Sequence, residues 1–229
     1  MTSSGTYNFS LSNSSIAEQA FSRIQLRHPA ILAEHVADAY AEMNLMMASK
    51  FSNLEPNLWK VDLVSTPLIA GTATYAVDAK TTNILDAYIS FNNSTTSNRL
   101  IFPVSRTEYA SYPNPTAQGV PSVFWYDKLI NPTITLWFVP DASATYTLNY
   151  YRTIQIQDAN LTGGETPDIP QRWMDAVVAE LSYRMARIWK PEMMQALKVD
   201  AQEAWTIAAT ADVEDVPLSI APGLDSYFR

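Results

Sequence analysis

His28 and His35 are the first candidates for acid–base chemistry or metal binding, because imidazole titrates near neutral pH and is a common metal ligand. They are the only histidines in the chain. Seven positions would place both on one face of a continuous helix, but Pro29 interrupts a helix at that point. No His-Glu-x-x-His pattern and no third ligand lies close in sequence. We therefore interpret both histidines as ordinary polar residues.

Other catalytic signatures are missing from the sequence. The chain has no cysteine, which excludes a disulfide framework and a thiolate metal site. Its six glycines form neither a Gly-x-Gly-x-x-Gly run nor a loop ending in Gly-Lys-Ser or Gly-Lys-Thr. No Gly-x-Ser-x-Gly elbow is present. The sequence therefore predicts no catalytic residue, no metal site and no cofactor.

Two groups of carboxylates remain as candidate sites. Asp168 follows Pro167, as in some nuclease motifs, but no strand with Glu-x-Lys comes after it, so a turn or capping role is favoured. Asp212, Glu214 and Asp215 come together after the last predicted helix. A divalent cation could bind there, but such a cluster is more often solvated or bound to a basic partner.

Aromatic residues in the middle of the chain allow two interpretations. They could form a sugar-binding platform, or they could be ordinary strand and core residues, and the second reading is favoured. The residues concerned are Trp125, Tyr126, Trp137, Tyr150 and Tyr151. The first reading would make the protein a glycan-binding or fibre-attachment module of a tail or baseplate, which stays open as the alternative.

The charge balance argues against a protein that grips nucleic acid. The chain carries 15 basic and 23 acidic residues and has no run of lysine or arginine. Proteins that hold nucleic acid usually show a basic patch, because phosphate neutralisation supplies much of the affinity. The content of 47% hydrophobic and 17% charged residues is typical of a globular protein. No apolar run approaches the roughly 18 residues that a membrane span needs.

Helical patterns occupy both ends of the chain. Ser15-Ile16-Ala17-Glu18 is typical of a capping box, with Ser14 or Ser15 as the cap of a first helix. Pro29 is well placed as the first residue of a second helix, which should fade near residues 52–56. Its apolar stripe consists of Leu32, Val36, Tyr40, Met43, Met47 and Phe51.

Two further helices are predicted after a loop at residues 161–170. Pro170 opens the first and Pro191 the second, and so short a link favours antiparallel packing. The first stripe consists of Trp173, Val177, Leu181, Met185 and Ile188. The second helix carries Met194, Leu197, Ala201, Ala204, Trp205 and Ala208.

Between the helices the apolar pattern has a period of two, which indicates strands. Seven short strands are predicted, separated by segments rich in turn residues. They cover residues 59–63, 72–77, 84–91, 100–104, 123–126, 133–138 and 145–152. The last two flank Pro140-Asp141 and are predicted to form a hairpin.

This order of elements predicts an α+β fold, with an α-helical bundle of terminal helices and an inserted antiparallel β-sandwich or open-barrel module. Residues 1–56 would supply an N-terminal tail and the first helices of the bundle. Residues 57–160 would form the β module, and residues 161–212 the remaining helices. Residues 213–229 would form an extended C-terminal docking tail.

An ordered series of short motifs, covering roughly residues 68–209, resembles a known family. The motifs are LIAGTATYAV at 68–77, ILDAY at 84–88, RTEY at 106–109, NP at 114–115, GVP at 119–121, TLWFVPDA at 135–142, YTLNYYR at 146–152 and PDIPQRWMDAV at 167–177. Each motif alone is short, but their order resembles the head–tail adaptor (connector) proteins of short-tailed double-stranded-DNA bacteriophages.

The resemblance implies a non-enzymatic virion protein, assembled in the host cytoplasm. Such adaptors form a ring, typically dodecameric, beneath the portal, extend the DNA channel and offer a platform for the tail nozzle or fibres. DNA would pass through without specific binding, and no membrane is involved. By this analogy the C-terminal tail contacts the portal or a neighbouring subunit. The residues concerned are Leu218, Ile220, Leu224, Tyr227, Phe228 and Arg229.

Overall fold

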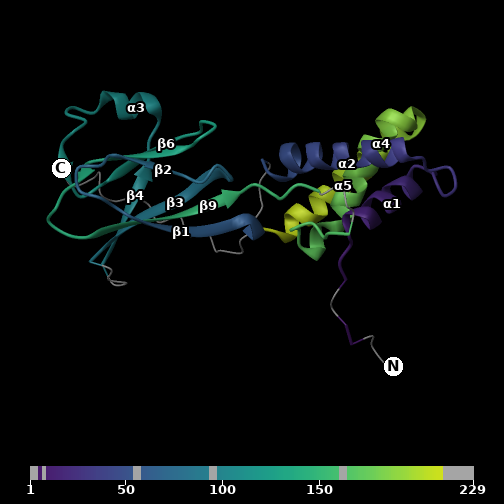
Figure 1. Cartoon of the computed structure of the whole chain (residues 1–229), viewed down its shortest axis with the longest axis horizontal. Coiled ribbons are helices and arrows are strands. Elements are labelled where there is room, and N and C mark those ends of the chain that lie inside the picture. The colour runs from purple at the N-terminus through teal and green to yellow at the C-terminus, as the bar shows by residue number, and fades with distance from the viewer. Residues whose placement is uncertain (1–4, 7–8, 54–57, 93–96, 160–163, 214–229) are drawn as a thin grey trace, which may run out of the picture.

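Helices from both ends of the chain lie together at one end of an elongated molecule, and strands from the middle of the chain form the other end (Figure 1). The structure is a computed structural model, and it describes residues 5–6, 9–53, 58–92, 97–159 and 164–213. The arrangement confirms the predicted α+β fold, in which the helical patterns flank the strand patterns in sequence.

The N-terminal helices form as predicted but begin elsewhere. Helix α1 (Asn13–Arg23) is capped by Ser12, whose hydroxyl accepts a hydrogen bond from the Ser15 amide, so it begins before the predicted Ser14 or Ser15 cap. Helix α2 (Ala33–Met46) begins after Pro29 rather than at it, because His35 Nδ1 accepts the Leu32 amide at 2.9 Å and caps the helix there. A π turn, η1 (Met47–Phe51), ends the segment near the predicted position.

All seven predicted strands form, and they build one curled sheet. Its order is β1-β9-β3-β4-β6-β7-β2. The strands are β1 (Val61–Pro67), β2 (Thr74–Ala76), β3 (Thr81–Phe91), β4 (Asn98–Pro103), β6 (Val123–Asp127), β7 (Thr133–Trp137) and β9 (Tyr146–Ile154). A short 3₁₀ turn, η2 (Leu58–Lys60), leads into β1.

The strand pairing differs from the prediction in two places. β4 and β6 pair in parallel, because helix α3 (Arg106–Ser111) carries the chain over between them. The predicted hairpin of residues 133–138 with 146–150 is wrong: β7 pairs with β6 and β2, whereas β9 pairs with β1 and β3. Between them, β8 (Val139–Pro140) pairs in parallel with β5 (Gln118–Gly119) and carries the chain to the other half of the sheet.

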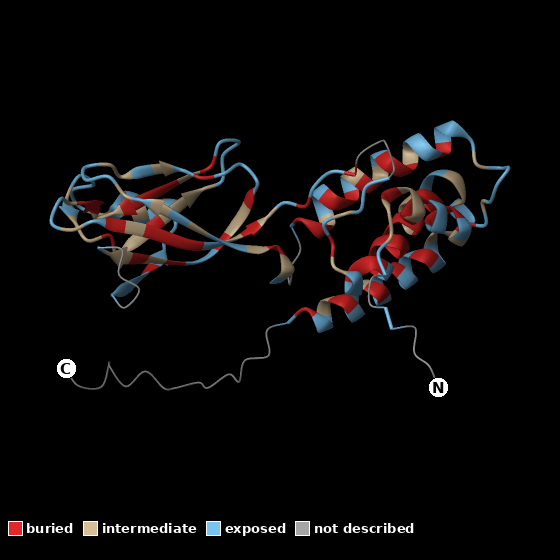
Figure 2. Ribbon diagram, turned by 60° about the horizontal axis from the view of Figure 1, so that its bottom comes forward, coloured by how far each residue is buried: buried red, intermediate tan, exposed pale blue. Residues whose placement is uncertain are grey.

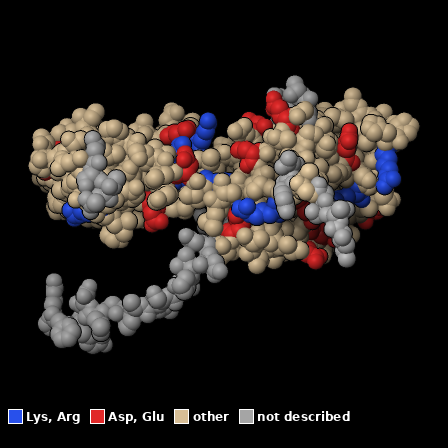
Figure 3. Space-filling model, turned by 90° about the horizontal axis from the view of Figure 1, so that it is seen from below, with Lys and Arg blue, Asp and Glu red and all other residues tan. Residues whose placement is uncertain are grey.

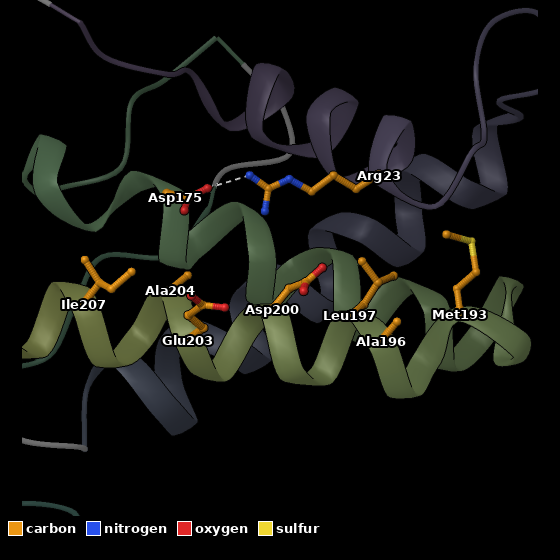
Figure 4. A pocket seen from close by; sticks show the side chains of 9 residues that line it. All are labelled: Arg23, Asp175, Met193, Ala196, Leu197, Asp200, Glu203, Ala204 and Ile207. Carbon is orange, nitrogen blue, oxygen red and sulfur yellow. Dashed lines mark hydrogen bonds and ion pairs between the residues drawn. The ribbon is translucent and has the colours of Figure 1, made fainter.

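The two C-terminal helical segments begin at or next to the two prolines predicted to open them, Pro170 and Pro191. After η3 (Gln171–Trp173), helix α4 (Met174–Trp189) is followed by η4 (Pro191–Met193) and helix α5 (Met194–Ala211). The start of α4 lies beside the end of α5, which confirms the antiparallel pair (Figure 4). The predicted α4 stripe is buried except for Ile188, which is exposed because it lies near the end of the helix.

Buried residues gather in two separate cores (Figure 2). The first lies among α1, α2, α4 and α5 and is rich in methionine and alanine. The second lies inside the curled sheet, where Ile134 and Leu136 of β7 meet Leu148 and Tyr150 of β9. The predicted divisions at residues 56–57 and 160–161 fall outside the described residues, so these boundaries stay a prediction.

Polar groups join the helical end to the strands. Where the chain leaves β9, the Ile156 amide donates to Ser52 Oγ at 3.2 Å, and the Ala159 amide donates to Asn44 Oδ1 at 2.7 Å. Where the chain approaches β1, the Leu58 amide donates to Asp212 Oδ2 at 3.1 Å. We call this region the junction. Because these bonds satisfy main-chain groups, they hold the entry and exit of the sheet against the helices.

Candidate functional site

The predicted docking tail lies outside the described residues. All six residues proposed to contact the portal or a neighbour fall in the range 214–229. They are Leu218, Ile220, Leu224, Tyr227, Phe228 and Arg229. Their role therefore stays a prediction, and the described surfaces must be judged by themselves.

A groove runs along α5, between that helix, the end of α1 and the start of α4 (Figure 4). Its volume is about 590 Å³. The residues that line it are Arg23, Asp175, Met193, Ala196, Leu197, Asp200, Glu203, Ala204 and Ile207. We call it the α5 groove.

The groove follows from how the helices pack. α1 packs on α4, and α5 packs on α4 beside it. The inner stripe of α5 consists mainly of alanines, including Ala204, with Leu197 as its largest buried member. Because an alanine methyl reaches little beyond the backbone, these side chains do not fill the space between α5 and α1. An open trough with an apolar floor therefore remains.

The rim of the α5 groove is acidic. Arg23 and Asp175 form an ion pair across it at 2.6 Å. Asp200 and Glu203 are exposed, and neither forms an ion pair with a described residue. Figure 3 shows carboxylates spread over the helical end on the face seen from below. Three carboxylates against one guanidinium favour a partner that brings an apolar surface together with positive charge.

The far side of α4 carries a different cluster of charges. Glu180 is buried and accepts from Lys50 Nζ at 2.6 Å and from Arg184 Nε at 3.2 Å. Arg184 also lies 3.4 Å from Glu42 on α2. Lys50 Nζ lies 4.7 Å from the centre of the Trp205 ring. These charges satisfy one another and tie α2 to α4, so the cluster is structural.

The five aromatic residues of the proposed sugar platform do not share a surface. Tyr150 is buried in the β core, and Tyr126 packs against that core from β6. Burial raises the pKa of both phenols. Tyr151 is exposed on the opposite face of β9. The prediction that these aromatic residues are strand and core residues is therefore confirmed for Tyr126 and Tyr150.

Trp125 and Trp137 lie under helix α3. The Tyr109 ring of α3 lies 5.7 Å from the Trp125 ring. Tyr112 stacks on Trp137 at a ring distance of 4.5 Å. Both tryptophans are half-buried, so α3 and the turn that follows it cover the surface that a sugar ring would need.

The histidines and the remaining candidate carboxylates have structural contacts. His35 is buried, caps α2 and lies 4.1 Å from the Trp189 ring, whereas His28 is exposed. Asp168 accepts the Gln157 amide at 3.1 Å, in keeping with a turn carboxylate. Among the described residues no cluster of histidines and carboxylates could hold a metal ion.

Asp212 departs from its prediction. The residue was expected to be solvated or bound to a partner, but it is buried at the junction. It forms an ion pair with Arg172 and accepts the Leu58 amide. These bonds to the chain itself explain its burial. Glu214 and Asp215, the other members of the predicted acidic cluster, lie outside the described residues.

The α5 groove was missed by sequence reasoning. Its only signal is that α5 has a narrow stripe of small residues beside Asp200 and Glu203. Such a pattern fits a plain surface helix equally well. The groove exists because of where α1 packs, and the sequence pattern of α5 does not indicate that position.

Comparison with known proteins identifies the family. Curated proteins include no match to this chain. A family model described as "SU10 adaptor protein" matches residues 13–221, which include all the described helices and strands. In the described part of the chain, no helix combines the length and the apolar character needed to cross a membrane. The match confirms the resemblance to bacteriophage head–tail adaptors, and the chain belongs to the SU10 adaptor protein family.

Proposed function

We propose that this protein is a non-enzymatic adaptor that forms a dodecameric ring beneath the portal of a short-tailed phage. The ring extends the DNA channel and gives the tail nozzle or the tail fibres a place to attach. The observation that carries this proposal is the match to an adaptor family across residues 13–221, because it covers the helical end and the sheet together.

The contacts of the titratable groups support a structural role. Three buried titratable groups, His35, Glu180 and Asp212, each bind groups that hold the fold together. These three side chains act as a helix cap, a link between helices and a link at the junction.

The charge of the chain suits a DNA channel. The formal net charge is −8, which repels phosphate at distances within the screening length. A channel that must release a genome works best if its wall does not bind DNA. We propose that DNA passes through the ring without specific contacts and that the ring belongs to the virion, at the head–tail junction.

The portal contact is assigned to the C-terminal tail. Its apolar and aromatic side chains would fill pockets on the portal, with Arg229 at the end. Those side chains are Leu218, Ile220, Leu224, Tyr227 and Phe228. Tail nozzle or fibre proteins would bind on the side of the ring away from the portal.

Mixing the purified protein with its portal tests the ring. The protein alone should be a monomer or a weak oligomer by analytical ultracentrifugation. With portal present, negative-stain images should show a second ring of density below it. Portal images that are identical with and without the protein would contradict the proposal.

Removing residues 217–229 tests the tail. Portal binding should be lost while the circular dichroism spectrum stays the same, because the described helices and strands end before this segment. Removing residues 1–8 is a matched control, since the family match begins at residue 13 and Ser12 still caps α1. A truncated tail variant that binds the portal normally would show that the tail assignment is wrong.

A further inference from the structure

The turn between β6 and β7 exposes two large apolar side chains. Leu129 is 60% exposed and Ile130 is 93% exposed. The base of the turn is fixed, because Asp127 pairs with Thr133 and the Val77 amide donates to the Pro132 carbonyl at 2.9 Å. Apolar side chains exposed next to one another on a turn are typical of an interaction site.

Positive charge lies on the same turn and on its neighbour. Lys128 precedes the two apolar residues and is exposed. Lys80 is exposed on the β2–β3 turn, three residues after the Val77 amide that binds Pro132. Neither lysine forms an ion pair with a described residue. We call Lys128, Leu129 and Ile130 the knob.

Asp78 lies on the same turn as Lys80 and offsets part of its charge, because the charge of Lys80 is among the causes that lower the pKa of Asp78. The Lys80 backbone amide donates to Asp78 Oδ1, and this holds the pKa of the carboxyl below its ordinary value. Arg152 acts in the same direction and lies 3.3 Å from Asp78 Oδ2. Asp78 therefore stays ionised and paired with Arg152, and Lys128 is the positive charge that the knob itself carries.

We propose that the knob of one copy enters the α5 groove of a neighbouring copy. Leu129 and Ile130 would cover the end of the apolar floor around Ala204 and Ile207. Lys128 would approach the carboxylates on its rim. Apolar contact and opposite charge coincide on the two surfaces, and this complementarity identifies a second copy as the occupant. The inference rests on the proposed ring and names the contact that closes it.

The positions of the two surfaces fit side-by-side copies. The β2–β3 turn beside the knob reaches the junction, since the Gln155 amide donates to the Lys80 carbonyl at 2.8 Å. Ile207 lies at one end of the groove. Asp212, which binds Leu58 at the junction, follows Ile207 by little more than one helical turn. Both surfaces therefore lie at a similar height along the molecule, as neighbours related by rotation about a ring axis require.

The surfaces also lie on different sides of the molecule. In Figure 1, β6 runs along the upper edge of the sheet, whereas α1 and the yellow end of α5 lie on the lower side of the helical end. A contact between two different surfaces is heterologous, and it closes into a ring when the rotation between neighbours divides the circle evenly. One knob and one groove on each copy are sufficient for this.

Disulfide trapping tests the contact directly, because the chain has no cysteine of its own. A variant carrying Ile130→Cys and Ile207→Cys should give a ladder of covalent multimers when oxidised on the portal. Each single variant should give no ladder. The matched control combines Ile130→Cys with Gln195→Cys, which is exposed on α5 but outside the groove. A ladder from the control equal to that of the pair would overturn the inference.

A mixing experiment gives an independent readout. Ile130→Asp breaks only the knob and Ile207→Asp breaks only the groove, and both residues are exposed, so folding should be unaffected. On the portal, neither variant alone should form a closed ring, and a mixture should form pairs of neighbouring copies that do not close into a ring. Ile69→Asp changes a side chain that is 66% exposed elsewhere, and it should assemble like the wild type.

The outcomes separate the contact from the ring itself. If both aspartate variants form normal rings on the portal, the knob–groove contact is wrong while the proposed ring stands. If Ile130→Cys forms disulfides only with cysteines introduced into the portal, the knob is a portal contact and the inference also fails. If the wild type forms no ring with the portal, the proposed function fails, and the knob–groove contact, which rests on it, fails with it.

Discussion

Helices α4 and α5 are antiparallel neighbours of similar length, yet they meet their surroundings in different ways. Ten of the 16 residues of α4 are buried, on almost every side of the helix. Only four of the 18 residues of α5 are buried, in one stripe against α4. α4 is therefore the centre of the helical end, whereas α5 covers it from outside.

Because of this difference, we expect α4 to determine the stability of the fold and the exposed side of α5 to determine what the protein binds. Substitutions in α4 remove contacts on several sides, so they should lower the free energy of unfolding. Substitutions of fully exposed side chains on α5 remove no described hydrogen bond or ion pair to another element, so they should leave the fold unchanged and alter only what binds there. Paired variants on the two helices can test this division.

The largest difference is expected between Leu181→Ala on α4 and Ile207→Ala on α5. Leu181 is fully buried, and its truncation leaves a cavity, which should cost about 2–5 kcal/mol of the free energy of unfolding. Ile207 is 65% exposed, so its truncation should change the free energy by no more than about 0.5 kcal/mol. Urea unfolding followed by tryptophan fluorescence measures both values. Equal losses would show that α5 is as much a part of the core as α4.

A smaller difference is expected between two glutamates. Glu180→Ala leaves Lys50 and Arg184 without their shared carboxylate in a partly buried place, which should cost about 2–3 kcal/mol. Glu203→Ala on α5 removes an exposed charge and should leave the urea midpoint unchanged. If Glu180→Ala were as stable as the wild type, the cluster on α4 would be a surface feature instead of a link between helices.

The same contrast explains which elements the sequence could predict. The α4 stripe from Trp173 to Met185 and the break at Pro191 are local patterns, and the helices follow them. The α1 cap was misplaced because Ser12, Ser14 and Ser15 are equally good caps, and only the local geometry selects Ser12. Local patterns thus predict that an element exists better than they predict where it begins.

Contacts between distant segments could not be predicted in this way. A period of two shows that β7 and β9 each bury one face, but it does not show that they lie in different halves of the sheet. The burial of Asp212 depends on Leu58, which is 154 positions away in sequence. The α5 groove likewise depends on where α1 packs. Each of these features needs the three-dimensional arrangement, which no single segment encodes.

Outside its buried stripe, α5 should contribute little to the free energy of unfolding, and the end of the helix should be the exception. Asp212 follows the helix and accepts the Leu58 amide and the Arg172 guanidinium. Asp212→Asn keeps an oxygen acceptor but loses the charge, so it should lower the free energy of unfolding by about 1 kcal/mol. Asp200→Asn on the same helix is exposed and should have no measurable effect. No loss in Asp212→Asn would mean that the junction does not depend on this charge.

The smallest effect is expected on the exposed side of α5, where only helix propensity should matter. Thr206 is exposed, and its hydroxyl donates to the Gln202 carbonyl at 2.8 Å. Alanine loses less side-chain entropy in a helix than the β-branched threonine, so Thr206→Ala should raise the free energy of unfolding by about 0.3–0.6 kcal/mol. Thr210→Ala, at an equivalent exposed position, should behave alike. Thermal unfolding followed by circular dichroism measures both, and a loss of stability in either variant would show that this side of α5 makes contacts that its exposure does not reveal.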